Sequence, residues 1–389
     1  MRNLNKKEIN ISTPFIDNNE INAVKKVINS GWLTSGKETK KFETNIKKYI
    51  NCKNVLAVNS CTSGLNSAMH ALNLKKGDEV ITSPMTFVSA INNLYNFGLK
   101  IKLVDVDLET YMMDINKLKK SVSSKTKCII ITHYGGVPFD IDKIVSFCRK
   151  KKIKIIEDAA TALGSKINGK YIGSNSYSVA VFSLYANKII TTGEGGIMTC
   201  EDNKLANRIK IINSCGISKD PWVRKKSKMQ YQYDVTYPGF KYNFTDIQSA
   251  IGIEQLKKLK KIIKYRELIR NYYLKELKQL IRNKTIFIQN VRKNQKPAFY
   301  IFTILLNKKK TSKKRDDLIR FLKEKKVNTS VHYIPANKHI FYKKQFKHFK
   351  LSNSNYVYEN ILSLPFHNNL KMTDIKFVCG VIKKFFIIK

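Results

Sequence analysis

Long hydrophobic runs are missing from this sequence of 389 residues. No stretch reaches the roughly 18 uninterrupted apolar residues that a membrane span requires, and the first 15 residues, MRNLNKKEINISTPF, lack the apolar run of a secretory signal. We therefore expect a cytoplasmic protein with no membrane-inserted segment. Repeats and low-complexity tracts are missing as well, and 43% of the residues are hydrophobic, which predicts a chain that is globular throughout.

Two short motifs are also missing. The seven cysteines form no C-x-x-C pair, which argues against both a zinc site and a disulfide framework, so we expect no bound metal and cysteines that act as small buried apolar residues or plain thiols. No G-x-G-x-x-G follows the first predicted strand. That absence argues against a nucleotide-dependent oxidoreductase, which an α/β pattern would otherwise allow.

Acidic residues are scarce, with 29 Asp and Glu against 72 Lys and Arg and a formal net charge of +43. Such an excess can indicate a nucleic-acid partner. Here the lysines are spread over the predicted solvent faces of helices, as in residues 256–280, and no nucleic-acid-binding module accompanies them. We interpret the excess as a compositional bias and expect no nucleic-acid partner.

Short β-branched runs alternate with helical stretches in the first half of the chain. The runs cover residues 54–58, 79–83, 101–107, 127–133 and 153–158. This alternation predicts an α/β fold with a largely parallel sheet. Two further runs, 178–184 and 195–200, have only a loop between them, which predicts an antiparallel return and therefore a mixed sheet.

The second half of the chain has a different pattern. A helix is expected at about 202–214, then a polar and aromatic loop over 216–244, then a long amphipathic helix from Thr245 to about Leu280. Strands at 299–306 and 328–334 and helices at 315–326 and 373–386 follow as a compact α+β set. We expect a large domain with an N-terminal arm over 1–245, and a linking helix with a smaller C-terminal domain over 246–389.

Candidate ligand-binding residues follow the predicted strands, because ligands of α/β sheets gather at the carboxyl ends of strands. Thr62 and Ser63 open a helix whose free N–H groups suit a phosphate, or they merely cap that helix. Phe87 can stack on a flat heterocycle or belong to the core. Asp158 ends an apolar strand, where a buried acid requires a partner such as a protonated pyridine nitrogen, or serves as a helix cap.

Lys188 lies between an apolar strand and the glycine-rich turn 193–196. Desolvation lowers the pKa of an ammonium group and exposes the nucleophilic amine that Schiff-base chemistry needs. In so lysine-rich a chain, a single lysine is more often a solvated side chain. The order of phosphate cradle, aromatic ring, carboxylate and amine at successive strand ends favours the reactive amine.

Over nearly its whole length the sequence resembles the sugar aminotransferases of the DegT/DnrJ/EryC1/StrS type. The resemblance is most specific in the run K-x-x-T-T-G-E-G-G from Lys188 and the run N-x-T-D-x-Q-x-A from Asn243, and it extends to residues 30–36, 77–81, 104–107, 133–136, 157–160 and 331–333. It implies the fold type I architecture of aspartate aminotransferase, with a large mixed-sheet domain and a smaller α+β C-terminal domain. It also implies pyridoxal 5'-phosphate as the cofactor.

The resemblance assigns a role to each matching residue. Lys188 would form a Schiff base with the cofactor and then carry protons, and Asp158 would keep the pyridine nitrogen protonated. The remaining cofactor contacts would come from Phe87 on the ring, from Thr62, Ser63 and Ser183 on the phosphate, and from Asn243 on the phosphate of the neighbouring subunit. His332 and Tyr333 match a segment near the substrate.

Two positions depart from the pattern of the family. Thr161 replaces a usual His or Gln that reaches the ring hydroxyl of the cofactor, and Tyr185 replaces a usual His. We expect Thr161 still to face the cofactor and Tyr185 to face the substrate. Neither change removes the amine or the acid, so the implied reaction class stands.

The activity implied is the transfer of an amino group from L-glutamate to a nucleotide-linked keto-sugar, most similar to amination at C4 of a UDP-4-keto sugar for surface polysaccharide, lipid A or glycans. A homodimer with shared active sites is implied too. Two alternatives on the same fold are a 3-aminotransferase and a dehydratase-type lyase, in which histidine replaces the lysine at position 188. The positive charge of the chain would attract such an anionic substrate.

Overall fold

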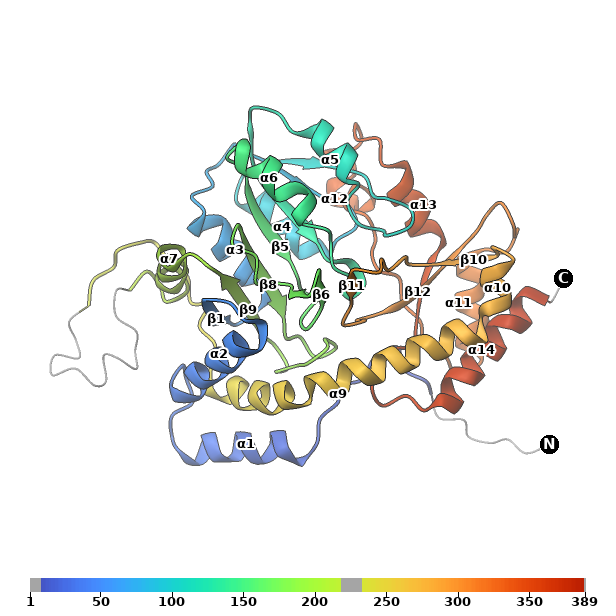
Figure 1. Cartoon of the computed structure of the whole chain (residues 1–389), viewed down its shortest axis with the longest axis horizontal. Coiled ribbons are helices and arrows are strands. Elements are labelled where there is room, and N and C mark those ends of the chain that lie inside the picture. The colour runs from blue at the N-terminus through green and yellow to red at the C-terminus, as the bar shows by residue number, and fades with distance from the viewer. Residues whose placement is uncertain (1–7, 218–232, 388–389) are drawn as a thin grey trace.

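A seven-stranded mixed sheet forms the centre of the protein, seen in the computed structural model, which describes residues 8–217 and 233–387 (Figure 1). Its strands are β1 (Asn54–Val58), β2 (Glu79–Thr82), β3 (Lys100–Leu103), β4 (Thr126–Thr132), β5 (Lys154–Asp158), β8 (Ser178–Ser183) and β9 (Gly196–Cys200), in the order β1-β9-β8-β5-β4-β2-β3. Strands β3, β2, β4, β5 and β8 pair in parallel, whereas β9 runs antiparallel to both β1 and β8. The predicted mixed sheet with an antiparallel return is confirmed.

Both faces of this sheet are buried, which explains why its strands read as nearly continuous apolar runs. Alternate residues of a strand point to opposite faces, so Ile156 belongs to one apolar cluster and its neighbour Ile155 to another. The helices around the sheet are α2 (Lys37–Ile50), α3 (Cys61–Ala71), α4 (Val88–Asn96), α5 (Ile115–Ser121), α6 (Asp142–Lys150) and α7 (Asn203–Asn213). A small sheet joins β6 (Lys166–Ile167) and β7 (Lys170–Tyr171) to β11 (Gln295–Lys296).

A second, antiparallel sheet of three strands lies in the C-terminal part, with β12 (Phe302–Leu306) between β10 (Ile286–Ile288) and β13 (Ile361–Leu364). The helices of this part are α10 (Lys278–Arg282), α11 (Arg315–Glu324), α12 (Ile340–Lys343), α13 (Ser352–Asn360) and α14 (Met372–Ile387). The strand expected over 328–334 is wrong, since only Ser330 pairs there, with Ser363 in an isolated bridge. Beyond it, the His332 carbonyl accepts a hydrogen bond from the Tyr134 hydroxyl and not from a neighbouring strand.

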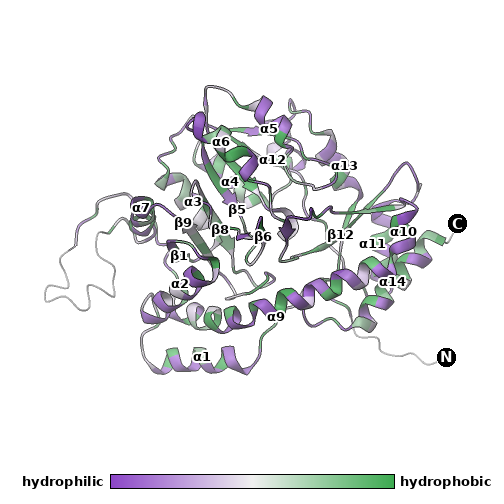
Figure 2. Ribbon diagram, in the orientation of Figure 1, coloured by the Kyte–Doolittle hydropathy of each residue, from purple (hydrophilic) through white to green (hydrophobic). Residues whose placement is uncertain are grey.

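The long helix α9 (Asp246–Glu276) connects the two sheets (Figure 1). Its N-cap Thr245 forms a capping box with Gln248, which explains why the helix begins where the sequence predicts. It packs against α1 (Asn18–Asn29), α2 and α14, and Figure 2 shows hydrophobic and hydrophilic residues alternating along it. The division of the chain into two domains at residue 245 stays a prediction.

The first residue of α9, Asp246, also caps the N-terminus of α2. The N-cap of α2 is Gly36, which has no side chain to accept the free N–H groups of that helix. The buried carboxylate of Asp246 takes this place, because it accepts hydrogen bonds from the backbone N–H groups of Gly36, Glu38 and Thr39 and from the Thr39 hydroxyl, at 2.7 to 3.2 Å. Two segments about 200 residues apart are thereby joined.

Among the described residues, no helix is both long and apolar enough to cross a bilayer. In the same part of the chain, no three side chains of His, Cys, Asp or Glu come together as metal ligands.

We predict that Asp246→Ala lowers the free energy of unfolding by about 2–4 kcal/mol, because hydrogen bonds to a buried charged acceptor are lost and their donors stay buried. Urea unfolding followed by circular dichroism measures the change. The control is Asp317→Ala, which removes an exposed pair with Arg320 on α11 and should cost less than about 0.5 kcal/mol. Equal effects of the two substitutions would show that Asp246 has no such role.

Candidate active site

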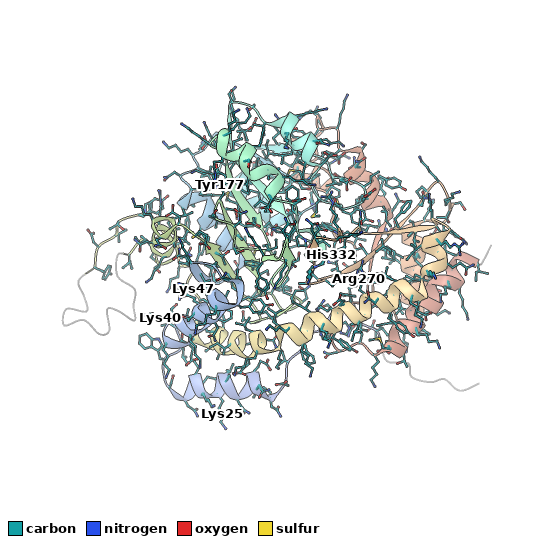
Figure 3. All side chains as sticks on the ribbon, in the orientation of Figure 1. Lys25, Lys40, Lys47, Tyr177, Arg270 and His332 are labelled. Carbon is teal, nitrogen blue, oxygen red and sulfur yellow. The ribbon has the colours of Figure 1, made fainter. Side chains whose placement is uncertain are left out.

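A cavity of about 410 Å³ opens where the carboxyl ends of the central strands meet. All predicted site residues line it except Ser63 and Asn243; those present are Thr62, Phe87, Asp158, Thr161, Ser183, Tyr185, Lys188, His332 and Tyr333. They come from four strand ends and from the segment that follows residue 330. Figure 3 places His332 near the middle of the molecule, between the main sheet and the C-terminal part.

The last residue of β5, Asp158, is the buried acid of this cavity. Its carboxylate accepts hydrogen bonds from the Thr86 hydroxyl at 3.1 Å and from the Ala160 N–H at 3.3 Å. Burial raises the pKa of the Asp158 carboxyl, and these two bonds together with the charge of Lys188 act against that rise. No cationic side chain of the described residues forms an ion pair with it.

A buried acid whose two hydrogen-bond donors are both neutral is short of positive charge. A protonated pyridine nitrogen supplies that charge. The donor set of the cavity therefore fits pyridoxal phosphate at this end.

The amine of Lys188 lies over the ring of Tyr300, 4.5 Å from the ring centroid. The Tyr300 hydroxyl donates a hydrogen bond to Asn187 Oδ1 at 3.1 Å, and Tyr300 is itself buried. The ring and the bond together restrict the directions that the Lys188 side chain can take. The sequence does not point to Tyr300, because this residue lies in an apolar run that predicts a strand, whereas the strand begins only at Phe302.

Aromatic rings form the opposite wall. Phe87 is the N-cap of α4, and 59% of its surface is exposed. The ring of Tyr333 meets Phe87 edge-on at 6.2 Å and Tyr134 edge-on at 6.1 Å. An open aromatic face at the mouth of a polar cavity suits a stacked heterocycle.

The beginning of α3 forms the end of the cavity that suits a phosphate. The N-cap of this helix is Ser60, whose hydroxyl accepts the Ser63 N–H at 3.0 Å and lies 2.8 Å from the Ser63 hydroxyl. Thr62 lines the cavity, and Asn93 holds its carbonyl with a hydrogen bond of 2.7 Å. Ser60 and Ser183 are hydroxyls in the lining beside Thr62, while Ser63 supports the turn from behind.

The hydroxyl of Thr161 is already engaged within the chain. It donates to the His133 carbonyl at 2.8 Å and accepts the Gly136 N–H at 3.1 Å. Thr161 thus lines the cavity but ties β5 to the turn after β4. Since a hydroxyl has a single proton to donate, the bond that the family pattern implies to an oxygen of the cofactor would require Thr161 to release His133.

Behind Asp158 lies a buried pair of His133 and Glu157, with Nε2 and Oε2 2.9 Å apart. His133 Nδ1 accepts the Phe139 N–H at 2.9 Å, so that the Nε2–H points to Glu157. The second oxygen of Glu157 accepts the Ser178 hydroxyl. This network fixes the end of β4, the end of β5 and the start of β8 relative to one another. The backbone N–H of His133 also donates to the Asp158 carbonyl, at 3.1 Å.

Asn243 lies outside this cavity. Its amide donates to the hydroxyls of Thr34 and Ser35 at 3.4 and 3.2 Å, and it lines a different cavity of about 520 Å³ beside β1 and α2. Within one chain, Asn243 is therefore not brought to Lys188. Part of the aromatic loop before it, residues 218–232 with Trp222 and Tyr231, lies outside the described residues.

Comparison with known proteins agrees with this arrangement. Residues 14–383 match the sequence profile of the DegT/DnrJ/EryC1/StrS aminotransferase family. The chain is 35% identical over 375 residues to the spore coat polysaccharide biosynthesis protein SpsC of Bacillus subtilis, covering 96% of this chain and 95% of SpsC. It is 39% identical over 373 residues to the uncharacterized protein MJ1066 of Methanocaldococcus jannaschii, covering 95% and 96% of the two chains.

Two solved structures illustrate the range of the fold. PseC of Helicobacter pylori, an aminotransferase involved in the biosynthesis of pseudoaminic acid, superposes with a TM-score of 0.90 at 27% identity over 98% of this chain and all of the PseC chain. GDP-4-keto-6-deoxymannose-3-dehydratase superposes with a TM-score of 0.86 at 24% identity, over 96% of this chain and 99% of the other. The latter likeness shows a common fold alone.

We predict that stability falls between pH 6.5 and 4 because of two histidines. Burial lowers the pKa of His332 to about 4, with help from the charge of Lys188, and burial likewise lowers the pKa of His367 to about 4. Below pH 6.5 the unfolded chain binds protons that the folded chain excludes, so each histidine should lower the free energy of unfolding by about 2 kcal/mol between pH 6.5 and 5.

Urea unfolding at a series of pH values measures this slope. His332→Asn and His367→Asn should each flatten it, and the double variant should flatten it further. If the single variants follow the wild-type curve, the two imidazoles are protonated as readily in the folded chain as in the unfolded one.

Proposed function

Because this chain belongs to the DegT/DnrJ/EryC1/StrS family and is a pyridoxal-phosphate-dependent sugar aminotransferase, we propose that it aminates C4 of a UDP-linked 4-keto sugar with L-glutamate as the amino donor. Enzymes of this family serve nucleotide-sugar or polysaccharide biosynthesis. The product would enter a surface polysaccharide, lipid A or a glycan. A nucleotide-sugar 3-aminotransferase is the alternative within the same reaction class.

One observation carries the proposal: the amine of Lys188, the buried carboxylate of Asp158 and the open ring of Phe87 face a single cavity at the carboxyl ends of the sheet. When bound, pyridoxal phosphate supplies an electron sink for the charge that develops on the carbon next to the transferred nitrogen. Asp158 would hold the proton on the pyridine nitrogen, Phe87 would cover the ring, and Ser60, Thr62 and Ser183 would bind the phosphate with the N–H groups of α3.

Lys188 would then move the proton at the reacting carbon. Its amine is the basic group beside Asp158 in the cavity. Contact with Tyr300 would restrict the direction of this amine both while the amino group is taken from the donor and while it is passed to the sugar. His332 is neutral near pH 7 because its pKa is about 4. It would therefore offer a hydrogen bond to a substrate hydroxyl without adding charge, and Tyr185 and Tyr333 would line the sugar.

The lysine distinguishes this reaction from that of the dehydratase-type lyase. A histidine in place of Lys188 has no primary amine and therefore could not form a Schiff base with the cofactor. The presence of Lys188 in the cavity supports a transaminase.

We further propose a homodimer with shared sites. Among the described residues that line the cavity, the basic side chains are Lys188, which would be bonded to the cofactor, and the neutral His332. The carboxylates of the donor and the phosphate of the cofactor would therefore need further polar groups from elsewhere, beyond the hydroxyls and N–H groups at the start of α3. Asn243, which lies outside the cavity of its own chain, would reach the phosphate in the site of a second copy.

We predict that Lys188→Ala abolishes transamination and the near-visible absorption band that borohydride removes, because no amine remains to bond the cofactor. Thermal unfolding should change little, since the lysine faces a cavity and not the core. Lys170→Ala, on the exposed strand β7, is the control and should keep both band and activity. Turnover by Lys188→Ala at a rate near that of the wild type would contradict the assignment.

A mixing experiment tests the shared site. Lys188→Ala protein is combined with an inactive Asn243 variant after reversible dissociation, and tagged hybrids are isolated. With shared sites, one site of each hybrid carries both lesions and the other carries none, so activity should partly return. If isolated hybrids stay inactive, Asn243 acts within its own subunit or not at all.

A further inference from the structure

A groove lined by basic residues lies between the middle of α9 and the small sheet that contains β6 and β11. It has a volume of about 540 Å³ and shares no described residue with the catalytic cavity. Figure 3 places Arg270, one of its residues, on α9. The cationic side chains of this basic groove are Lys166, Lys260, Lys264, Arg270 and Lys296, whereas Glu267 is the one acid among its described lining residues. The basic groove thus gathers a net positive charge in a small volume.

Close packing fixes the two walls of the basic groove. Gly164, in the turn before β6, has a φ of +89°, and a Cβ there would lie 2.5 Å from Ile263 Cδ1 on α9. Glycine therefore lets this turn lie directly against the helix. Tyr49, which lines the groove, packs its ring 4.9 Å from the ring of Tyr171 on β7. The basic side chains therefore project from packed elements whose positions are fixed.

Arg270 is a half-buried cation without an acceptor among the described residues. Its guanidinium lies 5.0 Å from the centroid of the Phe299 ring, and burial lowers its pKa, although the charge of Glu267 acts against that change. One turn earlier on α9, the buried Arg266 donates hydrogen bonds to one side-chain amide and three backbone carbonyls. In the described part of the chain, no such acceptor lies within hydrogen-bonding distance of the Arg270 guanidinium. A desolvated charged donor without an acceptor is unfavourable, and an anion in the groove would supply the acceptor.

Lys166 and Lys296 lie directly opposite each other in the antiparallel pair of β6 and β11. Like charges at such positions destabilise a sheet, and neither lysine forms an ion pair with a carboxylate of the described residues. Lys166 lies instead over the Tyr171 ring, with 4.1 Å between Nζ and the ring centroid. An anion between the two ammonium groups would offset their repulsion.

The cations of α9 indicate how long such an anion must be. Lys260, Lys264 and Arg270 all line the groove. At 1.5 Å per residue they extend over about 15 Å of the helix axis. A phosphate accepts hydrogen bonds only from donors within about 3 Å of its oxygens. A single phosphate therefore cannot neutralise both ends of the groove, and the ligand must carry several anionic groups along its length.

We propose that the basic groove binds a linear chain of several phosphate groups, an oligophosphate. The inference does not depend on which sugar the enzyme aminates. Neighbouring groups of such a chain share one bridging oxygen, so that its negative charges lie close together, whereas a whole sugar ring separates the carboxylates of an acidic polysaccharide. The phosphate chain therefore matches the density of cations better. Arginine binds a phosphate through two parallel hydrogen bonds, and lysine binds it as a point charge.

Two other occupants agree less well with the groove. A nucleic acid would offer bases that stack on open rings, but here Arg270 lies over Phe299 and Lys166 lies over Tyr171. A second copy of this chain would bring further cations to a basic surface, because the net charge is +43. Since the same excess places lysines on other surfaces as well, the test compares the groove with another face of the same helix.

The test measures binding of tripolyphosphate to the enzyme loaded with pyridoxal phosphate, by calorimetry at an ionic strength of about 0.15 M. Lys260→Gln combined with Lys264→Gln should raise the Kd by about 10- to 100-fold, because charge-assisted hydrogen bonds are lost. The control is Lys261→Gln combined with Lys275→Gln, which removes the same charge from exposed positions of α9 outside the groove. This control should change the Kd less than about twofold. Arg270→Lys, which keeps the charge, should bind more tightly than Arg270→Gln.

Equal losses of affinity in the two double variants would overturn the inference, since the anion would then respond to the net charge of the surface and not to the groove. A wild-type enzyme that binds tripolyphosphate no more tightly than inorganic phosphate would overturn it too. A change of oligomeric state in the groove variant on sedimentation would assign the groove to subunit contact, and binding of a short RNA without tripolyphosphate would assign it to nucleic acid. Transamination by the groove variant should be unchanged, and a rate that falls with the affinity would place the anion in the catalytic cavity instead.

Discussion

The arrangement of the active site depends on one electrostatic constraint, the burial of the Asp158 carboxylate at the end of β5. Taking a carboxylate out of water is costly unless positive charge or hydrogen bonds replace the water. The described part of the chain supplies only the Thr86 hydroxyl and the Ala160 N–H within bonding distance, with the charge of Lys188 acting through space. The pocket is therefore incomplete without a cation, and a protonated heterocycle completes it more directly than any side chain of the described residues does.

The antiparallel return of β8 and β9 places the amine opposite this acid. The turn between the two strands packs closely against the backbone at the start of α3. A Cβ atom at Gly196 would lie 2.7 Å from the Ser60 backbone. At Gly195, which has a φ of +156°, an added Cβ would meet Thr192 at 2.5 Å. Glycine at these positions lets the loop of Lys188 lie directly against the start of α3, so the groups for the amine and for the phosphate share one rigid support.

The sequence predicts those parts of the site that depend on local patterns, and it does not predict those that depend on contacts between residues far apart in the chain. Strand ends can be located from apolar runs, and residues just beyond them, such as Asp158 and Lys188, are found because parallel strands end at one edge. The roles of Tyr300 and His133 cannot be read from the sequence, since they depend on contacts between distant segments and not on local pattern. The same holds for the strand wrongly expected over 328–334, where a hydrogen bond from Tyr134 competes with sheet pairing. Thr161 shows a further limit, because only the structure reveals that its single proton is given to His133.

The large positive charge of the chain lies on its surface, whereas the groups that would carry out the reaction are buried in the cavity. Figure 3 shows Lys25, Lys40 and Lys47 on the outer helices, well away from His332. Exposed charges of this kind are screened within about 8–10 Å at physiological salt, so they alter the rate at which an anion arrives and not the pKa of buried groups. In the cavity, burial outweighs that field: it holds His332 neutral and raises the pKa of Asp158 despite a net charge of +43. Selectivity must therefore come from the shape and contacts of the cavity and its mouth, since the surface field attracts every anion alike.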